Sequence, residues 1–289
     1  MYNLAHNYSR VTLFTITGGH TVPHGYHPWQ ASIRIRGRDQ TYHWCGATII
    51  NRFYVITAAH CLRDFPMDTY FVRYVILKLP PLNICCFYFM YYFRVGDNLL
   101  DVVDKDESEY NIENMILHEN FNVGPYLNND IALVKIKAND SDSGMNFGQY
   151  VTPICLPAHN LAYKPNLKVN ITGWGKNGYE GTMRDSPRQT AQGAIIGKKT
   201  EVSTNSQKSF TKRLIFFSTF FPIELQMATV PLIPETRCTS SDVYGKDRVS
   251  MGMFCAGDLE GMIDSCQGDS GGPAVVDVQG RATLFGESI

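Results

Sequence analysis

Short stretches of alternating apolar and polar residues, separated by turn residues, constrain the fold of this 289-residue chain more than any other feature. Between positions 30 and 37, Ala31, Ile33 and Ile35 alternate with polar or charged residues, which is the period-two pattern of a β-strand. Further short strand-like runs, bounded by Gly, Asn or Pro, cover positions 44–50, 53–59, 130–136, 272–278 and 281–285. Many short strands joined by turns predict an all-β barrel or sandwich.

The segment 264–273 reads Asp-Ser-Cys-Gln-Gly-Asp-Ser-Gly-Gly-Pro and places Ser270 between an aspartate and two glycines. Glycine permits positive φ and a close approach to the backbone. This turn therefore indicates that another molecule must reach Ser270 Oγ and the nearby backbone N–H groups. A polar turn between two strands would have a similar composition, so Ser270 becomes a candidate nucleophile only if a base accompanies it.

The candidate base is His60, in the sequence Thr-Ala-Ala-His-Cys. Histidine has an ordinary pKa near ~6.5 and can accept the proton of a serine at neutral pH. The small residues before it permit a tight turn at the end of a strand. The other histidines lack this context, and most of them are interpreted as surface residues: His6, His20, His24, His27, His43, His118 and His159.

Asp130 is the candidate acid that would orient this base, because it begins the apolar run Asp-Ile-Ala-Leu-Val-Lys-Ile. A carboxylate at the start of such a strand tends to be buried, and a buried carboxylate requires hydrogen-bond donors. Taken alone, Asp130 is at least as well explained as a strand cap after Asn128 and Asn129. The chain order His60, Asp130, Ser270 is nevertheless that of the chymotrypsin triad, and differs from the order in subtilisin or the α/β-hydrolases.

Three segments resemble the signature motifs of the chymotrypsin family of serine proteases: Thr-Ala-Ala-His-Cys at 57–61, Asp-Ile-Ala-Leu at 130–133 and Gly-Asp-Ser-Gly-Gly-Pro at 268–273. Four further landmarks follow in the family's order: Ile-Thr-Gly-Gly at 16–19, Pro-Trp-Gln at 28–30, Thr-Gly-Trp-Gly at 172–175 and Met-Phe-Cys-Ala-Gly at 253–257. The resemblance covers most of residues 16–286. It implies two antiparallel β-barrels with the catalytic cleft between them, the second barrel being incomplete at the C-terminus.

The resemblance also implies a role for each residue in a trypsin-like endopeptidase that needs no cofactor or metal. Ser270 would attack the scissile carbonyl, His60 would take and return its proton, and Asp130 would orient the imidazole. The backbone N–H groups of Gly268 and Ser270 would form the oxyanion hole. Asp264 matches the base of the primary pocket and would pair with a substrate Arg or Lys before the scissile bond. Without the resemblance, Asp264 would be an ordinary solvated aspartate.

Zymogen activation in this family would require cleavage before Ile16, whose new amine would pair with Asp269 and order the oxyanion hole. Thr15 precedes Ile16 and the nearest upstream basic residue is Arg10, so trypsin is not expected to generate this N-terminus. The first fourteen residues lack the apolar region of a signal peptide. We therefore expect upstream sequence to be missing.

The chain has eight cysteines. By resemblance, Cys45 pairs with Cys61 and Cys238 pairs with Cys255, which implies an oxidising compartment and a secreted protein. Cys155 matches a cysteine that tethers the catalytic domain of many zymogens to an upstream pro-region.

Four stretches depart from the family pattern: residues 1–15, an aromatic segment at about 74–94, a Lys-rich and then Phe-rich segment at about 198–223, and the end at Ile289. The aromatic segment would be an aggregation hazard if exposed, and Lys, Pro and Asn residues interrupt it too often for a membrane span. Its Phe, Tyr and Pro codons are pyrimidine-rich, as intron 3′ ends are. We interpret the sequence as an imperfect gene model, with intron-derived inserts and a truncated C-terminus, and the alternative is lineage-specific loops.

The peptidase domain is accordingly placed at 16–289, after an upstream segment at 1–15 that is not native structure. We expect the chain in this form to fold poorly and hydrolyse little. A net charge of −1 gives no electrostatic case for nucleic acid or an anionic membrane, so protein or peptide substrates are expected. The alternative functions are a non-catalytic protease homologue that binds or regulates, which usually has a substituted triad, and a secreted interaction domain that leaves 264–273 unexplained.

Overall fold

A computed structural model describes residues 19–36, 41–63, 90–138, 143–158, 161–175, 223–257 and 268–289. The predictions that concern Ile16, Asp264 and the segments 1–15, 74–89 and 198–222 lie outside these residues. Within them, the structure contains no helix that is long and apolar enough to cross a membrane.

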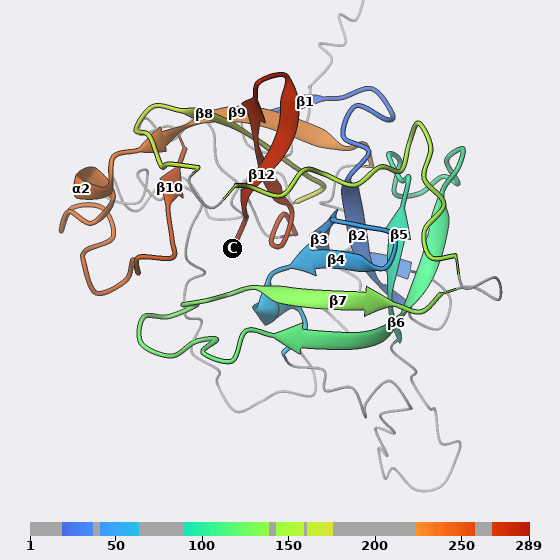
Figure 1. The fold of residues 1–289 in the computed structure, drawn as a ribbon, viewed down its shortest axis with the longest axis horizontal. Coiled ribbons are helices and arrows are strands. Elements are labelled where there is room, and N and C mark those ends of the chain that lie inside the picture. The colour runs from blue at the N-terminus through green and yellow to red at the C-terminus, as the bar shows by residue number, and fades with distance from the viewer. Residues whose placement is uncertain are drawn as a thin grey trace, which may run out of the picture.

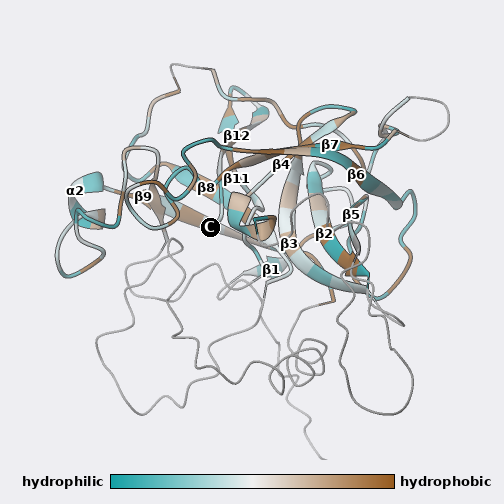
Figure 2. Cartoon of the chain, turned by 90° about the horizontal axis from the view of Figure 1, so that it is seen from below, coloured by the Kyte–Doolittle hydropathy of each residue, from teal (hydrophilic) through white to brown (hydrophobic). Residues whose placement is uncertain are grey.

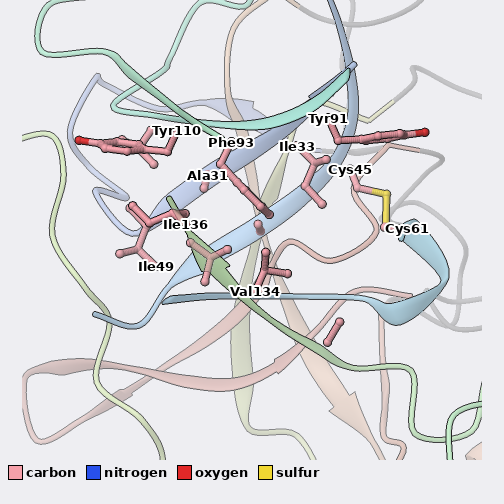
Figure 3. Packing of buried hydrophobic residues seen from close by; sticks show 14 of the residues in the cluster. Ala31, Ile33, Cys45, Ile49, Cys61, Tyr91, Phe93, Tyr110, Val134 and Ile136 are labelled. Carbon is pink, nitrogen blue, oxygen red and sulfur yellow. A yellow bond between two sulfur atoms is a disulfide. The ribbon is translucent and has the colours of Figure 1, made fainter. Parts of the chain in front are cut away.

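Six antiparallel strands form a closed barrel, called here the first barrel, in the order β2-β3-β4-β7-β6-β5 (Figure 1). The strands are β2 (Gln30–Arg36), β3 (Thr41–Ile49), β4 (Tyr54–Thr57), β5 (Met90–Val95), β6 (Ser108–Leu117) and β7 (Ala132–Ile136). Their alternate side chains fill the interior, where Ala31, Ile33, Phe93, Val134 and Ile136 meet (Figure 3). The all-β class predicted from the strand pattern is confirmed.

Strand β5 contains residues that the sequence analysis assigned to the aromatic segment. Residues 90–94 pair with β2 on one side, and from Tyr92 onward the strand also pairs with β6 on the other. Tyr91, Tyr92 and Phe93 are buried, and Phe93 is completely inaccessible to solvent. Closing the barrel requires a strand between β2 and β6, and this apolar run can bury both of its faces, so it takes that place rather than forming an exposed patch.

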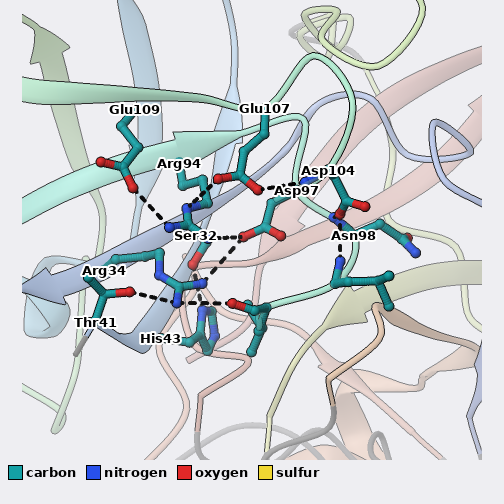
Figure 4. A network of polar contacts seen from close by, with 12 residues as sticks. Ser32, Arg34, Thr41, His43, Arg94, Asp97, Asn98, Asp104, Glu107 and Glu109 are labelled. Atoms are coloured by element: carbon teal, nitrogen blue, oxygen red, sulfur yellow. Dashed lines mark hydrogen bonds and ion pairs between the residues drawn. The ribbon is translucent and has the colours of Figure 1, made fainter. Parts of the chain in front are cut away.

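Ser32 and Arg34 on the polar face of β2 are buried as well, because a network of charged residues covers them, whereas Arg36 at the end of the strand is exposed (Figure 4). Arg34 donates to Thr41 Oγ1 at 3.0 Å and lies 3.4 Å from Asp97 Oδ2. Arg94, on β5, lies 3.7 Å from the same Asp97 oxygen and 3.1 Å from Glu107 Oε1. A buried guanidinium requires such partners, and these ion pairs supply most of them, although Arg34 Nε has no hydrogen-bond partner among the described residues.

A second antiparallel sheet, called the second sheet, has the strand order β1-β9-β8-β11-β12, with β10 also paired to β9. Its strands are β1 (His20–Thr21), β8 (Lys168–Gly173), β9 (Gln226–Ile233), β10 (Cys255–Ala256), β11 (Pro273–Val278) and β12 (Arg281–Glu287), and the short helix α2 (Glu235–Cys238) follows β9. Its core contains Val169, Val230, Leu232 and Val276. Figure 2 shows β9 as largely hydrophobic and β6, on the surface of the first barrel, as largely hydrophilic.

Candidate active site

His60 lies where the first barrel faces the second sheet, in a 3₁₀ turn, η1 (Ala59–Cys61), just after β4. Ala58 and Ala59 are completely buried, so a larger residue at either position would have no room. Cys61 forms a disulfide with Cys45 on β3, across a Cα–Cα distance of 6.3 Å. The turn is therefore fixed by close packing on one side and by a covalent bond on the other.

Asp130 binds His60 at two points. Its Oδ1 accepts a hydrogen bond from the His60 backbone N–H at 2.7 Å, and its Oδ2 accepts one from Nδ1 at 2.6 Å. The side chain of Asp130 is 2% exposed and that of His60 is 25% exposed. Because an ionised carboxylate only accepts hydrogen bonds, Nδ1 carries the proton, and Nε2 of the neutral ring is left as an acceptor.

Ser270 lies in the turn that leads into β11, and this turn packs against the first barrel through glycines. Gly46 N donates to Ser270 O at 2.8 Å. Gly271 has a φ of 78°, and a Cβ there would collide with the Thr57 side chain. A Cβ on Gly46 would lie 2.7 Å from the Cα of Gly272. The two halves of the molecule thus meet backbone to backbone beside Ser270, which a side chain at these positions would prevent.

The Cys45–Cys61 disulfide contacts both parts of the candidate site. Cys61 Sγ lies 3.7 Å from His60 Nε2 and 3.8 Å from the Ser270 carbonyl oxygen. Within the described residues, the hydrogen bonds do not include one from Ser270 Oγ to His60 Nε2. Such bonds are often long or poorly aligned in ligand-free sites. The structure therefore shows a direct hydrogen bond between His60 and Asp130. It also places the backbone of Ser270 beside the disulfide that His60 contacts.

Asp269 is 1% exposed and lies against the second sheet. Its Oδ1 accepts a hydrogen bond from Gly175 N at 2.7 Å. A Cβ on Gly173 or Gly175 would collide with this carboxylate, so both positions require glycine. Ile16, the predicted partner of Asp269, is outside the described residues, and this pairing stays a prediction.

His43 is a functional candidate that the sequence analysis missed, because it was interpreted as a surface residue. It is buried on β3, where Ser32 Oγ lies 2.7 Å from Nδ1 and the Gly268 carbonyl oxygen lies 2.8 Å from Nε2. Burial lowers the pKa of His43 to about 4, so the ring is neutral at pH 7. Since a carbonyl only accepts, Nε2 carries the proton, and the Ser32 hydroxyl donates to Nδ1.

This chain of hydrogen bonds fixes the carbonyl of Gly268, whose N–H is a predicted oxyanion donor. The signal that could have revealed His43 is its position one residue before the strand predicted at 44–50, close to Cys45, since the observed strand β3 begins earlier, at Thr41. His27 was also misassigned to the surface. It is 6% exposed, its Nε2 lies 3.0 Å from Met227 Sδ, and burial lowers its pKa to about 4.

A cavity of about 380 Å³ adjoins Asp130 on the side of Ile131, Phe254 and Glu287. Within the part of the chain that the structure describes, Glu287 Oε2 has no hydrogen-bond partner. Burial, and secondarily the nearby Asp130, raises the pKa of Glu287 well above its ordinary value. Burial next to Asp130 therefore favours the neutral form of the Glu287 carboxyl group.

Two groups of potential metal ligands occur among the described residues. One consists of Cys45, Cys61 and His60, but its sulfurs are joined in a disulfide and offer no thiolate. The other consists of Asp97, Asp104 and Glu107, all in the charged network of Figure 4. Arg94 contacts two of these carboxylates, and Asp104 Oδ2 accepts two backbone N–H groups, at 2.6 and 2.7 Å. The chain's own donors therefore engage at least one oxygen of each carboxylate, and among the described residues Asp97 Oδ1 is left without a hydrogen-bond partner.

The remaining predicted residues divide between described and undescribed parts of the chain. Cys238 is joined to Cys255 by a disulfide, which ties α2 to β10. Cys155 is an exposed free thiol. Asp264 lies outside the described residues, and its place in a specificity pocket stays a prediction.

Comparison with known proteins gives consistent matches over nearly the whole chain. Residues 16–221 and 216–287 match the family model described as Trypsin. Trypsin-1 of Astacus astacus is 30% identical over 271 residues, which cover 94% of this chain and 86% of that protein. Transmembrane protease serine 11C of Mus musculus is 30% identical over 260 residues, covering 90% of this chain and 43% of its own length. Transmembrane protease serine 11A of Homo sapiens is 28% identical over 261 residues, covering 90% and 45%. The chain thus spans less than half of these two larger relatives.

Proposed function

Because this chain belongs to the trypsin family of serine proteases, we propose that it is a serine endopeptidase whose catalytic triad is Ser270, His60 and Asp130. The observation that carries the proposal is the two-point hydrogen bond between Asp130 and His60. A buried carboxylate that holds Nδ1–H fixes the tautomer of the ring and leaves Nε2 to act as the base.

In the proposed reaction, Ser270 Oγ attacks the carbonyl carbon of the scissile peptide bond while its proton passes to His60 Nε2. The resulting imidazolium, stabilised by Asp130, then gives this proton to the leaving amine as the C–N bond breaks. Water, deprotonated by the same nitrogen, then attacks the acyl carbon; the C–O bond to Ser270 breaks, and His60 Nε2 returns the proton to Ser270 Oγ. The N–H groups of Gly268 and Ser270 would bind the developing oxyanion, where one donor is typically worth ~3 kcal/mol.

The finer parts of the proposal concern specificity, activation and location. Cleavage after Arg or Lys rests on the register of Asp264, six residues before Ser270. Activation would place an amine at Ile16 against Asp269, and the exposed Cys155 would tether an upstream pro-region. The two disulfides support a secreted protein, since such bonds persist in oxidising compartments.

A fluorophosphonate probe tests the nucleophile, because it labels only an activated serine. We expect the chain activated by cleavage before Ile16 to be labelled at Ser270, and Ser270→Ala to abolish the labelling. Ser240→Ala, which changes a serine after α2, is the matched control and is expected to label normally. If the folded and activated wild-type protein is not labelled, the proposal fails in favour of a non-catalytic homologue that binds or regulates.

Fluorogenic peptides test the specificity separately. Peptides with Arg or Lys before the scissile bond are expected to be cleaved, whereas a matched Phe peptide is not. Asp264→Ser is expected to remove this preference while the fluorophosphonate still labels Ser270. An unchanged preference in Asp264→Ser would refute the role of Asp264 and leave the triad untouched.

A further inference from the structure

Residues 118–131, called here the asparagine loop, join β6 to β7 and contain Asp130. The loop has no regular secondary structure, but three asparagine side chains bind its own backbone. Asn122 Oδ1 accepts from Leu127 N at 3.0 Å, Asn128 Nδ2 donates to Val123 O at 2.7 Å, and Asn129 Nδ2 donates to Asn120 O at 3.1 Å. Long irregular loops that are packed and bonded internally are frequently functional.

Asn129 has a left-handed backbone, with a φ of 52°. Among residues with a side chain, Asn and Asp adopt this conformation most readily. The turned backbone lets Asn129 O accept a hydrogen bond from Ile131 N at 2.9 Å, which closes a three-residue turn centred on Asp130. His118 N donates to Ile131 O at 3.0 Å and ties the turn to the end of β6.

The backbone of Asp130 is therefore held on both sides by residues that have no hydrogen bond to His60. Its carboxylate has to meet two donors of His60 at once, at 2.7 and 2.6 Å, with one oxygen for each. Because both oxygens of Asp130 must reach their donors together, the two hydrogen bonds tolerate little rotation of Asp130. A change in the backbone at Asn129 would turn Asp130 away from at least one of the two donors.

We propose that Asn129 is a positioning residue for the protease reaction: its left-handed backbone and its amide bond to Asn120 O hold Asp130 against His60. This inference rests on the proposed function. Asn129 acts through Asp130, which keeps the proton on Nδ1 and Nε2 free to receive the proton of Ser270. The simpler explanation is that Asn129 only stabilises the loop.

Asn122 allows the two explanations to be separated. Its φ of 61° is also left-handed, and its side chain also bonds the loop backbone, but it lies eight positions before Asp130. A merely structural role predicts that Asn122→Ala and Asn129→Ala have similar effects on Tm and on kcat. A positioning role predicts similar effects on Tm but a loss of kcat in Asn129→Ala alone.

The experiment measures kcat, KM and Tm of the protein activated by cleavage before Ile16, with a peptide substrate across a pH series. Asn129→Ala is expected to lower kcat about tenfold or more while KM stays within about twofold, because a small misplacement of a catalytic group is costly. Asn122→Ala is expected to change kcat less than about twofold. Asn129→Gly keeps the left-handed backbone and loses the amide, so its kcat is expected to lie between the wild type and Asn129→Ala.

Proton NMR supplies a second readout that does not require activity. A strongly hydrogen-bonded Nδ1–H of His60 gives a downfield resonance, which we expect Asn129→Ala to shift or broaden and Asn122→Ala to retain. Equal kcat values and unchanged resonances in wild type and Asn129→Ala would overturn the proposal, as would equal losses in both alanine variants. If the wild type resists fluorophosphonate but only Asn129→Ala loses the resonance, the proposed function fails and the positioning role stands.

Discussion

Acid is expected to destabilise this protein through the buried imidazole of His43. Burial lowers the pKa of this group from 6.5 to about 4, so the unfolded chain binds a proton that the folded chain excludes over that interval. Above pH 6.5 the imidazole is neutral in both states, and the free energy of unfolding is at its full value. As the pH falls from 6.5 toward 4, only the unfolded chain gains the proton, and the free energy of unfolding decreases. The loss reaches about 3 kcal/mol, because each pH unit with one proton of difference changes stability by about 1.4 kcal/mol.

Urea unfolding followed by tryptophan fluorescence at pH values from 7.5 to 4.5 measures this effect. His43→Gln removes the titration but keeps a side chain that can donate to Gly268 O. Its stability is expected to be lower at pH 7.5 and to fall by about 3 kcal/mol less than that of the wild type on acidification. His27, whose pKa burial also lowers to about 4, leaves part of the acid sensitivity in this variant.

The matched control is His20→Gln, which alters an exposed histidine on β1. It is expected to leave both the stability and its pH dependence close to those of the wild type. If His43→Gln and the wild type lose stability in parallel between pH 6.5 and 4.5, the argument from burial of His43 is wrong.

Three further predictions concern the site. Gly271→Ala is expected to lower the free energy of unfolding in urea by about 2 kcal/mol or more, because the positive φ and a clash with Thr57 both oppose a side chain. Gly280 has the same φ of 78° but open space around it, so an equal loss in Gly280→Ala would disprove the clash. Replacing both Cys45 and Cys61 by Ser is expected to lower the free energy of unfolding by about 3 kcal/mol, because the disulfide closes a loop of 16 residues in the unfolded chain. An unchanged Tm would contradict this. Asp130→Asn is expected to preserve the circular dichroism spectrum but to lower kcat about 10⁴-fold through the wrong tautomer of His60, and a near-normal kcat would exclude Asp130 from catalysis.

Local sequence patterns predicted much of the β-strand architecture, because period-two alternation and glycine turns are visible in a few consecutive residues. Short motifs likewise predicted the family. The runs near Ala31 and Val134 became barrel strands, and the trypsin-family resemblance is confirmed by the comparisons. The adjacency of His60 and Asp130 was predicted through the family motifs, since no local pattern joins residues seventy positions apart.

Contacts made only in three dimensions escaped prediction. Nothing near His43 in the sequence shows that Gly268, 225 positions later, will cover it. Likewise, Phe93 belongs to an aromatic run that the sequence pattern favoured as an insert. Its burial depends on the strands that pair with β5 when the first barrel closes. The left-handed backbone at Asn129 was not predicted either, because many asparagines adopt ordinary conformations and the residue type alone does not select this one.

The backbone contact between Gly46 and the turn at Ser270 has a consequence for how this protein would lose activity. His60 and Asp130 belong to the first barrel, whereas Ser270 is carried by the second sheet, and each of these has its own apolar core. The base and its acid would therefore stay together during a small sliding of one half against the other, while the nucleophile moved away. On the proposed mechanism, mild heat or pressure would then abolish proteolysis reversibly while both halves remain folded, so that loss of activity would precede the loss of the circular dichroism signal.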